Sequence, residues 1–258
     1  MLITSFYGLL VALASVVVAI AGLLLTQRLI PLSLRERHND TTGIIYAALY
    51  VMFGVTIGFS LFSVWQQYNT ARQVVHSEAA AVEQVYRLAG RFPEPDRTQI
   101  QELAVSYAKG TVDEEWPLMK EGRSSPRVEA NLDKLSQSVQ RYEPHTDAQD
   151  ALYAAALSAV DELEEDREFR LVAVNEGIPY IVWVVLVVGG VLTIAFTYLF
   201  GMENVWLHAV AVAGLTILVS LILHAIGVLD YPFNSSGVRV QPDAFEQVLR
   251  EIGGKGGS

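Results

Sequence analysis

Four polar side chains in an apolar segment are the residues best placed to do chemistry in this sequence. Thr56, Ser60, Ser63 and Gln67 recur at intervals of four, three and four residues and so share one face of a helix. Residues 41–71 contain no Asp, Glu, Lys or Arg, and roughly 20 such residues cross a bilayer. Because hydroxyl and amide groups are costly against lipid, we expect this polar stripe to meet water or another helix.

Two interpretations of the polar stripe stay open. If the stripe faces water, its four residues line an ion pathway, and Phe59, one position away, is the candidate for a hydrophobic constriction. If it faces a helix, its role is packing, since Gly54 and Gly58 form a GxxxG spacing nearby. Serine and threonine can also donate to carbonyls of their own helix.

Two acidic clusters raise the question of a metal site. They lie at residues 113–115 and 161–168. Neither has the loop spacing of an EF-hand, and the second lies on a predicted helix whose charges point around the cylinder. We therefore predict solvated faces that attract cations, with no metal ligand and no cofactor.

Other kinds of chemistry find little support in the sequence. No nucleophile is paired with a base, and neither a phosphate-binding glycine loop nor an HExxH motif occurs, so we predict no enzyme and no catalytic residue. The net charge is −10, and residues 66–178 hold 21 acidic against 12 basic side chains. An acidic surface repels nucleic acid. The absence of cysteine excludes disulfides and thiolate chemistry.

Long apolar runs are the elements that must position these residues. With 52% apolar residues, the 258-residue chain is predicted to be an all-α, multi-pass membrane protein. Its four expected spans cover residues 6–26, 44–65, 178–202 and 205–229. The corresponding domains are 1–65 with two spans, 66–178 as an acidic helical insert outside the membrane, 179–229 with two further spans, and 230–258.

Smaller signals divide the segments between the spans. Residues 27–42 are expected to form a polar loop. The second span is expected to continue without a break to about Gly90, followed by helices from about Asp96, from Pro126 after a Ser125 cap, and from the Thr146 cap to Asn175. Residues 242–252 read as a short amphipathic helix and 253–258 as a flexible tail.

The order of these features resembles a known family of membrane proteins. Two spans, a helical insert, two more spans and an Asp-x-Pro-Phe motif at Asp230, Pro232 and Phe233 are also the plan of bestrophins. The chain resembles more specifically the prokaryotic bestrophin-like proteins of unknown function. Other matching pieces are His38-Asn-Asp40, Trp65 with Tyr68 and Ala71, and Glu78-Ala79.

The resemblance implies a fold, an assembly and an activity. Bestrophins are pentameric anion channels whose second span lines a narrow neck, so the resemblance implies that Thr56, Ser60, Ser63 and Gln67 line a pore and that Phe59 constricts it. One part does not carry over. Bestrophins follow Pro-Phe with acidic residues that bind calcium, whereas residues 234–239 here contain none. We instead expect Asp230 to accept hydrogen bonds from backbone amides at the membrane edge.

The leading hypothesis is a homo-oligomeric ion channel in the inner membrane, whose partners are copies of itself, the lipid bilayer and small inorganic ions. The family resemblance favours anions, while the acidic insert favours cations. Because four crossings leave both termini and the insert on one side, we expect these parts to be cytoplasmic. The alternative is a membrane-anchored scaffold or sensor that binds a partner through its acidic helical insert and has no pore.

Overall fold

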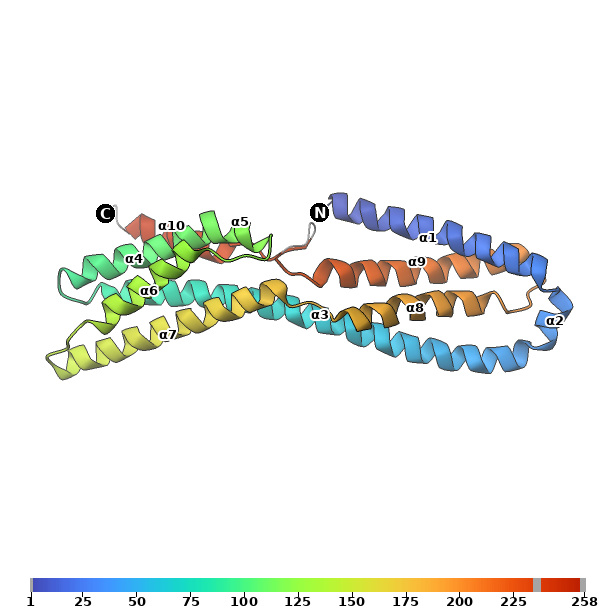
Figure 1. Cartoon of the computed structure of the whole chain (residues 1–258), viewed down its shortest axis with the longest axis horizontal. Helices are drawn as coiled ribbons and strands as arrows, with labels where there is room; N and C mark the ends of the chain where they lie inside the picture. The colour runs from blue at the N-terminus through green and yellow to red at the C-terminus, as the bar shows by residue number, and fades with distance from the viewer. Residues whose placement is uncertain (1, 234–237, 256–258) are drawn as a thin grey trace. The chain divides into compact units, whose positions relative to one another are not determined.

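The computed structural model describes residues 2–233 and 238–255, and within these ranges it contains helices and turns but no strand (Figure 1). The predicted all-α fold, with four membrane-length helices and a helical insert, is confirmed. The described residues form two compact units. The first comprises residues 2–66, 177–230 and 238, and the second comprises residues 67–176, 231–233 and 239–255.

The first unit contains the apolar helices. They are α1 (Leu2–Leu29), the short α2 (Leu32–Arg37), the beginning of α3 (Asn39–Ala89), α8 (Tyr180–Thr197) and α9 (Val205–Leu229). Apart from α2, each contains a stretch long and apolar enough to cross a membrane, as predicted. The helix α3 is continuous over 51 residues, which confirms that the second span runs on to the end of the first helix of the insert.

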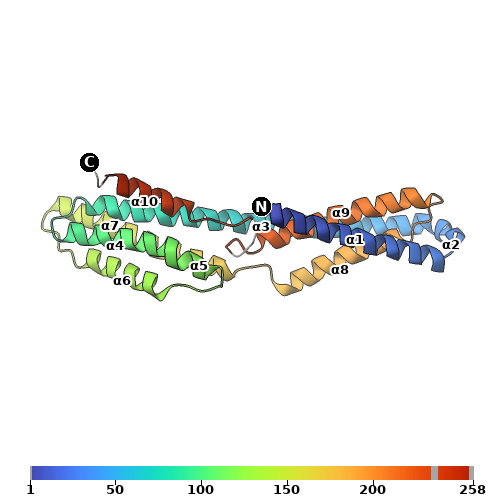
Figure 2. The ribbon, with the colours of Figure 1, turned by 90° about the horizontal axis from the view of Figure 1, so that it is seen from above.

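Buried apolar side chains bring the membrane-length helices together. The helices α1 and α9 lie side by side (Figures 1 and 2), and buried Leu23 clusters with buried Val212. Phe53 of α3 packs in a second cluster with Leu186 of α8. A Cβ added to Gly189 would lie 2.7 Å from the Phe53 ring, so this approach of α3 and α8 requires glycine.

The connection between the first two spans differs from the polar loop expected for residues 27–42. It contains the helix α2 after Pro31, and α3 begins at Asn39, so Asp40 lies in its first turn. Tertiary contacts explain the difference. Arg35 is buried and donates to the carbonyl oxygens of Tyr198 at 3.4 Å and Phe200 at 3.1 Å. Its guanidinium group therefore caps the C-terminal end of α8. The Asn39 side chain bonds both the N–H and the carbonyl oxygen of Gly201.

The second unit is a bundle of helices around one apolar core. Besides the remainder of α3, it contains α4 (Asp96–Gly110), a π-helical turn η1 (Thr111–Glu115), α5 (Trp116–Met119), α6 (Pro126–Gln140), α7 (Asp147–Asn175) and α10 (Asp243–Lys255). The predicted caps are present: Ser125 accepts a hydrogen bond from the N–H of Val128, and Thr146 from that of Gln149. The last helix runs three residues beyond the end expected at Ile252.

The core of this unit follows the apolar face of α3. Val75, Ala79 and Val82 are at most 1% exposed, at spacings of four and three residues. Large side chains from α4, α6 and α7 complete the core: Ile100, Tyr107, Leu135 and Leu163. Glu78 lies on this same apolar face and is fully buried. A buried carboxylate needs partners, and these define one of the sites described next.

Candidate pore surface and buried charge cluster

The membrane segment of α3 has one packed face and one free face within the chain. Phe53, Ile57 and Val64 are buried in the cluster shared with α8 and α9. On the other side of the helix Met52 and Phe59 are 72% and 71% exposed. The free face is therefore available to water, lipid or a second copy of the chain.

The structure divides the predicted polar stripe between these two faces. Thr56 is half-buried and donates to the carbonyl of Met52, and Ser60 is buried and donates to the carbonyl of Thr56, both at 2.9 Å. These two hydroxyls are thus satisfied on their own helix. Ser63 is exposed. Gln67 is half-buried, and its Oε1 has no hydrogen-bond partner among the described residues.

The GxxxG spacing also lies on open surface. A Cβ added to Gly54 or to Gly58 would meet no atom within 4 Å in the described part of the chain. These glycines therefore do not mediate helix packing within the chain. A small-residue surface of this kind allows close approach by a helix from another molecule.

Asp230 joins the start of α8 to the end of α9. It is 2% exposed, and its two carboxylate oxygens accept hydrogen bonds from the backbone N–H of Ile178 at 2.6 Å and from Nε1 of Trp183 at 3.0 Å. The first of these is the kind of backbone contact predicted for this residue. The indole donor was not foreseen.

The other two motif residues lie in the second unit. The carbonyl of Pro232 accepts a hydrogen bond of 2.8 Å from the N–H of Val240. Phe233 is 2% exposed and packs edge-on against Trp116, with ring centroids 5.8 Å apart. The Pro232 bond closes a turn within the C-terminal segment, and Phe233 fastens that segment to the insert. Residues 234–237, the start of the segment compared with the calcium-binding run, lie outside the described residues.

A buried charge cluster lies inside the second unit, formed by Glu78, Glu115, Arg167 and Arg170. Arg170 donates to Glu78 from Nε at 2.5 Å and from Nη2 at 2.9 Å, and its Nη2 also lies 2.7 Å from Glu115. Arg167 donates to Glu115 at 2.8 Å. Two carboxylates and two guanidinium groups make the cluster neutral, which allows it to be buried.

Further hydrogen bonds and a ring contact surround this cluster. The hydroxyl of Tyr107 donates to Glu78 at 2.5 Å, and the backbone N–H of Ser125 donates to Glu115 at 3.0 Å. The guanidinium carbon of Arg170 lies 5.6 Å from the centre of the Trp116 ring. The cluster therefore ties α3, α4, η1, α5 and α7 together through polar contacts.

The surroundings shift the acidity of two cluster groups in opposite directions. Burial would raise the pKa of Glu115, but Arg170 and Arg167 outweigh it and hold the pKa below its usual value. For Tyr107, burial and the neighbouring Glu78 carboxylate act together and raise the pKa well above its usual value. Glu115 is thus ionised and Tyr107 is a neutral hydrogen-bond donor at neutral pH.

The charge cluster was missed by the interpretation of the sequence, which treated Glu115 as part of a solvated acidic face. Glu115 is fully buried, so that interpretation is wrong for this residue. For residues 161–168 the exposed acidic face is present, because all the acidic side chains there except half-buried Asp166 are exposed. A signal was available: Glu78 interrupts the apolar positions Val75, Ala79 and Val82, which is where a buried partner is needed.

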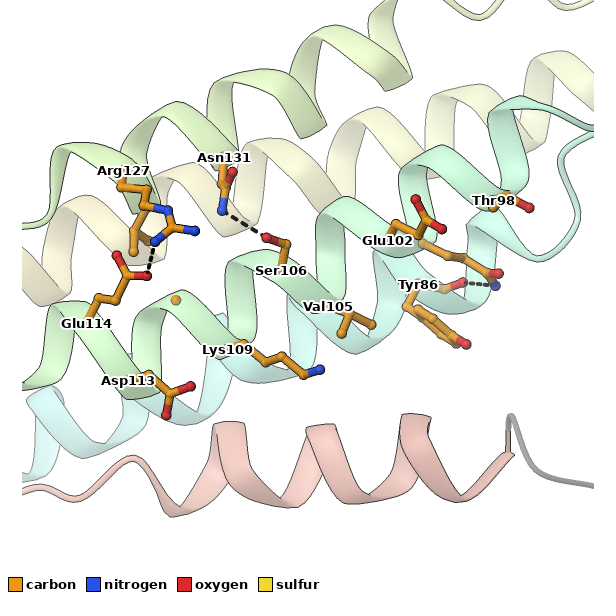
Figure 3. A pocket seen from close by; sticks show the side chains of 13 residues that line it. Tyr86, Thr98, Glu102, Val105, Ser106, Lys109, Asp113, Glu114, Arg127 and Asn131 are labelled. Carbon is orange, nitrogen blue, oxygen red and sulfur yellow. Dashed lines mark hydrogen bonds and ion pairs between the residues drawn. The ribbon is translucent and has the colours of Figure 1, made fainter.

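The insert also carries a surface pocket of about 560 Å³, shown in Figure 3. Arg127 pairs with Glu114 at 2.8 Å, and Asn131 donates to Ser106 at 3.0 Å, while Lys109 is exposed on the same surface. The residues that line the pocket include three carboxylates and two basic groups but no histidine. This mixture of charges suits the binding of a polar partner.

Comparisons with known proteins agree on one family and one fold. A family model described as "Bestrophin-like domain" matches residues 3–245. Crystal structures of two variants of a bacterial bestrophin homologue from Klebsiella pneumoniae align with TM-scores of 0.74 and 0.70 at 11% and 15% identity. Both alignments cover 96% of this chain, and 99% and 98% of the homologue. No curated protein sequence matches the chain.

Proposed function

Because the chain belongs to the bestrophin-like family, we propose that it is a homo-oligomeric ion channel whose pore is lined by α3. Several copies, five by the resemblance to bestrophins, surround a common axis in the inner membrane. In this assembly Thr56, Ser60, Ser63 and Gln67 line or border the pathway, Phe59 constricts it, and small inorganic ions pass. The insert and both termini are cytoplasmic.

The observation that carries this proposal is the free face of α3. Ser63 and Phe59 are both exposed there, four residues apart on the part of α3 that is long and apolar enough to cross a membrane. A hydroxyl on such a face is costly against lipid, and a chain of four spans is too small to enclose a wide pathway alone. Water at an axis shared by several copies satisfies the hydroxyl, and a ring of Phe59 side chains supplies a constriction that opens or closes by wetting.

Electrical recording of purified protein in planar bilayers tests the pore. We expect Phe59→Ala to raise single-channel conductance, because it widens the constriction, and Ser63→Leu to lower it, because it replaces a hydrophilic side chain by a large apolar one. The matched control is Phe6→Ala on α1, which removes a ring of similar exposure, 62%, from a different helix. If wild-type protein carries no current, or if conductance is the same in all variants, α3 does not line a pore.

For the permeant ion we propose anions, as the bestrophin resemblance implies. The acidic surface of the insert works against this choice, because it concentrates cations near any entrance that it borders. The reversal potential in a KCl gradient decides between the two: a value near the chloride equilibrium potential supports anions, and a value near that of potassium contradicts them. Particle mass in detergent gives the number of subunits.

A scaffold or sensor without a pore is the second candidate. The pocket in Figure 3 favours it, because its mixed charges lie on exposed surface where a polar partner can reach them. In that case the purified particle is a monomer or a dimer without a central axis. The wild-type protein would then carry no current. Lys109→Glu, which reverses an exposed charge in the pocket, would abolish partner binding.

A further inference from the structure

An apolar groove lies on the surface of the protein between the membrane-length helices α1, α8 and α9. Its volume is about 670 Å³. Small or aliphatic buried side chains form its floor, namely Ala19, Gly190 and Val219, while Val18 and Val191 are 71% and 61% exposed at its rim. The groove includes no residue of α3 among those that line it, so it is separate from the proposed pore surface.

Two hydroxyl groups in the groove already donate hydrogen bonds within their own helices. Ser15 donates to the carbonyl of Val11 at 2.9 Å, and Thr216 donates to that of Val212 at 2.7 Å. None of the residues that line the groove carries a charge at neutral pH. The occupant must therefore be predominantly apolar, because a charged group along the groove would find no countercharge.

The length of the groove matches one leaflet of a bilayer. Its lining runs from Val11 to Gly22 on α1, and from Val187 on α8 to Tyr198 directly after that helix, which are eleven residue steps each. At about 1.5 Å per residue this is roughly 16 Å, close to half of the ~30 Å hydrocarbon core. A single extended acyl chain spans that depth.

A tyrosine marks one end of the groove. Tyr198 follows α8 directly, and its ring packs on Gly22, where an added Cβ would lie 3.0 Å from the ring. No hydrogen bond to its hydroxyl is recorded within the described residues, so the hydroxyl can donate to an acceptor outside the chain. Tyrosine rings of this kind lie at the headgroup level of membranes, where ester carbonyls are available.

We propose that this groove is a binding site for one acyl chain of a membrane phospholipid, with the ester region beside the Tyr198 hydroxyl. A lipid is favoured over a helix from a second copy by the polar donor at one end and by a length that corresponds to one leaflet. The inference does not depend on whether the protein conducts ions.

Photo-crosslinking of the full chain in liposomes tests the site. The liposomes contain phosphatidylcholine and phosphatidylglycerol without sterol, plus phosphatidylcholine with a diazirine in the middle of its acyl chain. We expect mass spectrometry to find label concentrated on groove peptides that include Val18 and Val191. Ala14→Phe fills the groove and should remove this label, whereas Ala21→Phe, at an exposed alanine of α1 outside the groove, should retain it.

A second variant examines the polar end. Tyr198→Phe keeps the ring on Gly22 but removes the donor, and the loss of one hydrogen bond should lower labelling by about two- to tenfold. Unchanged labelling would overturn the role of the hydroxyl. Label spread evenly over all exposed apolar positions would show ordinary boundary lipid and overturn the site. If the groove peptides stay unlabelled while peptides elsewhere are labelled, another copy of the chain covers the groove. This result would also overturn the proposed lipid site.

Discussion

Arg170 holds both carboxylate oxygens of Glu78, from Nε to Oε2 at 2.5 Å and from Nη2 to Oε1 at 2.9 Å, and both side chains are fully buried. The two residues are 92 positions apart in the sequence, on α7 and α3. A pair of this kind adds little stability compared with apolar side chains of the same shape, but losing one partner leaves a buried charge uncompensated. The charge cluster is thus a place where single substitutions are costly.

Replacing Arg170 by methionine should destabilise the insert strongly. The change leaves Glu78 and Glu115 buried without their shared partner, at a cost of roughly 3–5 kcal/mol. Hydrogen–deuterium exchange of insert peptides in the full chain measures this loss. Arg123→Met is the control, since Arg123 is paired at the surface with Glu121, and its replacement should change stability by no more than about 0.5 kcal/mol. Equal effects of the two changes would show that the cluster is not critical.

Acid should loosen the insert through Glu115. Its pKa is lowered in the folded protein from the ordinary value of 4.5, so the unfolded state takes up a proton first as the pH falls. The stabilisation is complete well above pH 4.5, begins to decline near that value, and is lost once the pH falls through the folded pKa. Exchange protection of insert peptides between pH 7 and pH 3 measures the decline. In Glu115→Gln this part of the pH dependence should disappear; a variant that declines as steeply as wild type would refute the assignment.

The carboxylate of Asp230 should be irreplaceable by an amide. In Asp230→Asn the amide oxygen could still accept from the N–H of Ile178, but the new NH2 group would face the indole N–H of Trp183, so one buried donor is left unpaired at a cost of about 1–3 kcal/mol. Thermal unfolding in detergent measures the loss. Adding Trp183→Phe removes the opposing donor and should recover part of it. Asp243→Asn, at an exposed position, should have little effect.

Two glycines should respond oppositely to alanine. A Cβ at Gly201 would lie 2.5 Å from the backbone nitrogen of Glu36, so Gly201→Ala must displace α2 or the turn after α8. We expect a clear fall in thermal stability and loss of the bonds between Asn39 and Gly201. At Gly214 on α9 a Cβ meets nothing within 4 Å in the described chain, and Gly214→Ala should stabilise the helix by up to about 1 kcal/mol. Similar melting temperatures for both variants would contradict this contact.

Local signals in the sequence predicted most of the fold. Hydropathy located all four membrane-length helices, because a span must be apolar along its whole length. Ser125 and Thr146 located two helix starts in the insert, because capping depends on neighbours a few residues away. The resemblance to bestrophins agreed with the family model over residues 3–245.

What the sequence did not predict depends on distant partners. The helix α2 is held by bonds from Arg35 and Asn39 to residues some 160 positions away. The burial of Glu115 depends on two arginines of α7. For the polar stripe, spacing alone indicated a shared face, while the packing of α3 on α8 and α9 decides which of its members are covered within the chain.

The π-helical turn η1 has a consequence for how this chain can vary in length. The N–H of Trp116 bonds the carbonyl of Thr111, five residues earlier, so this turn holds one residue more than an α-helical turn. Removing a single residue here would restore ordinary α-helical spacing and leave the helix after the deletion close to its present register. A deletion within the regular turns of α4 would instead rotate Glu115 by about 100° away from its arginines, so η1 is the place in this helix where the chain can shorten by one residue and keep its interior.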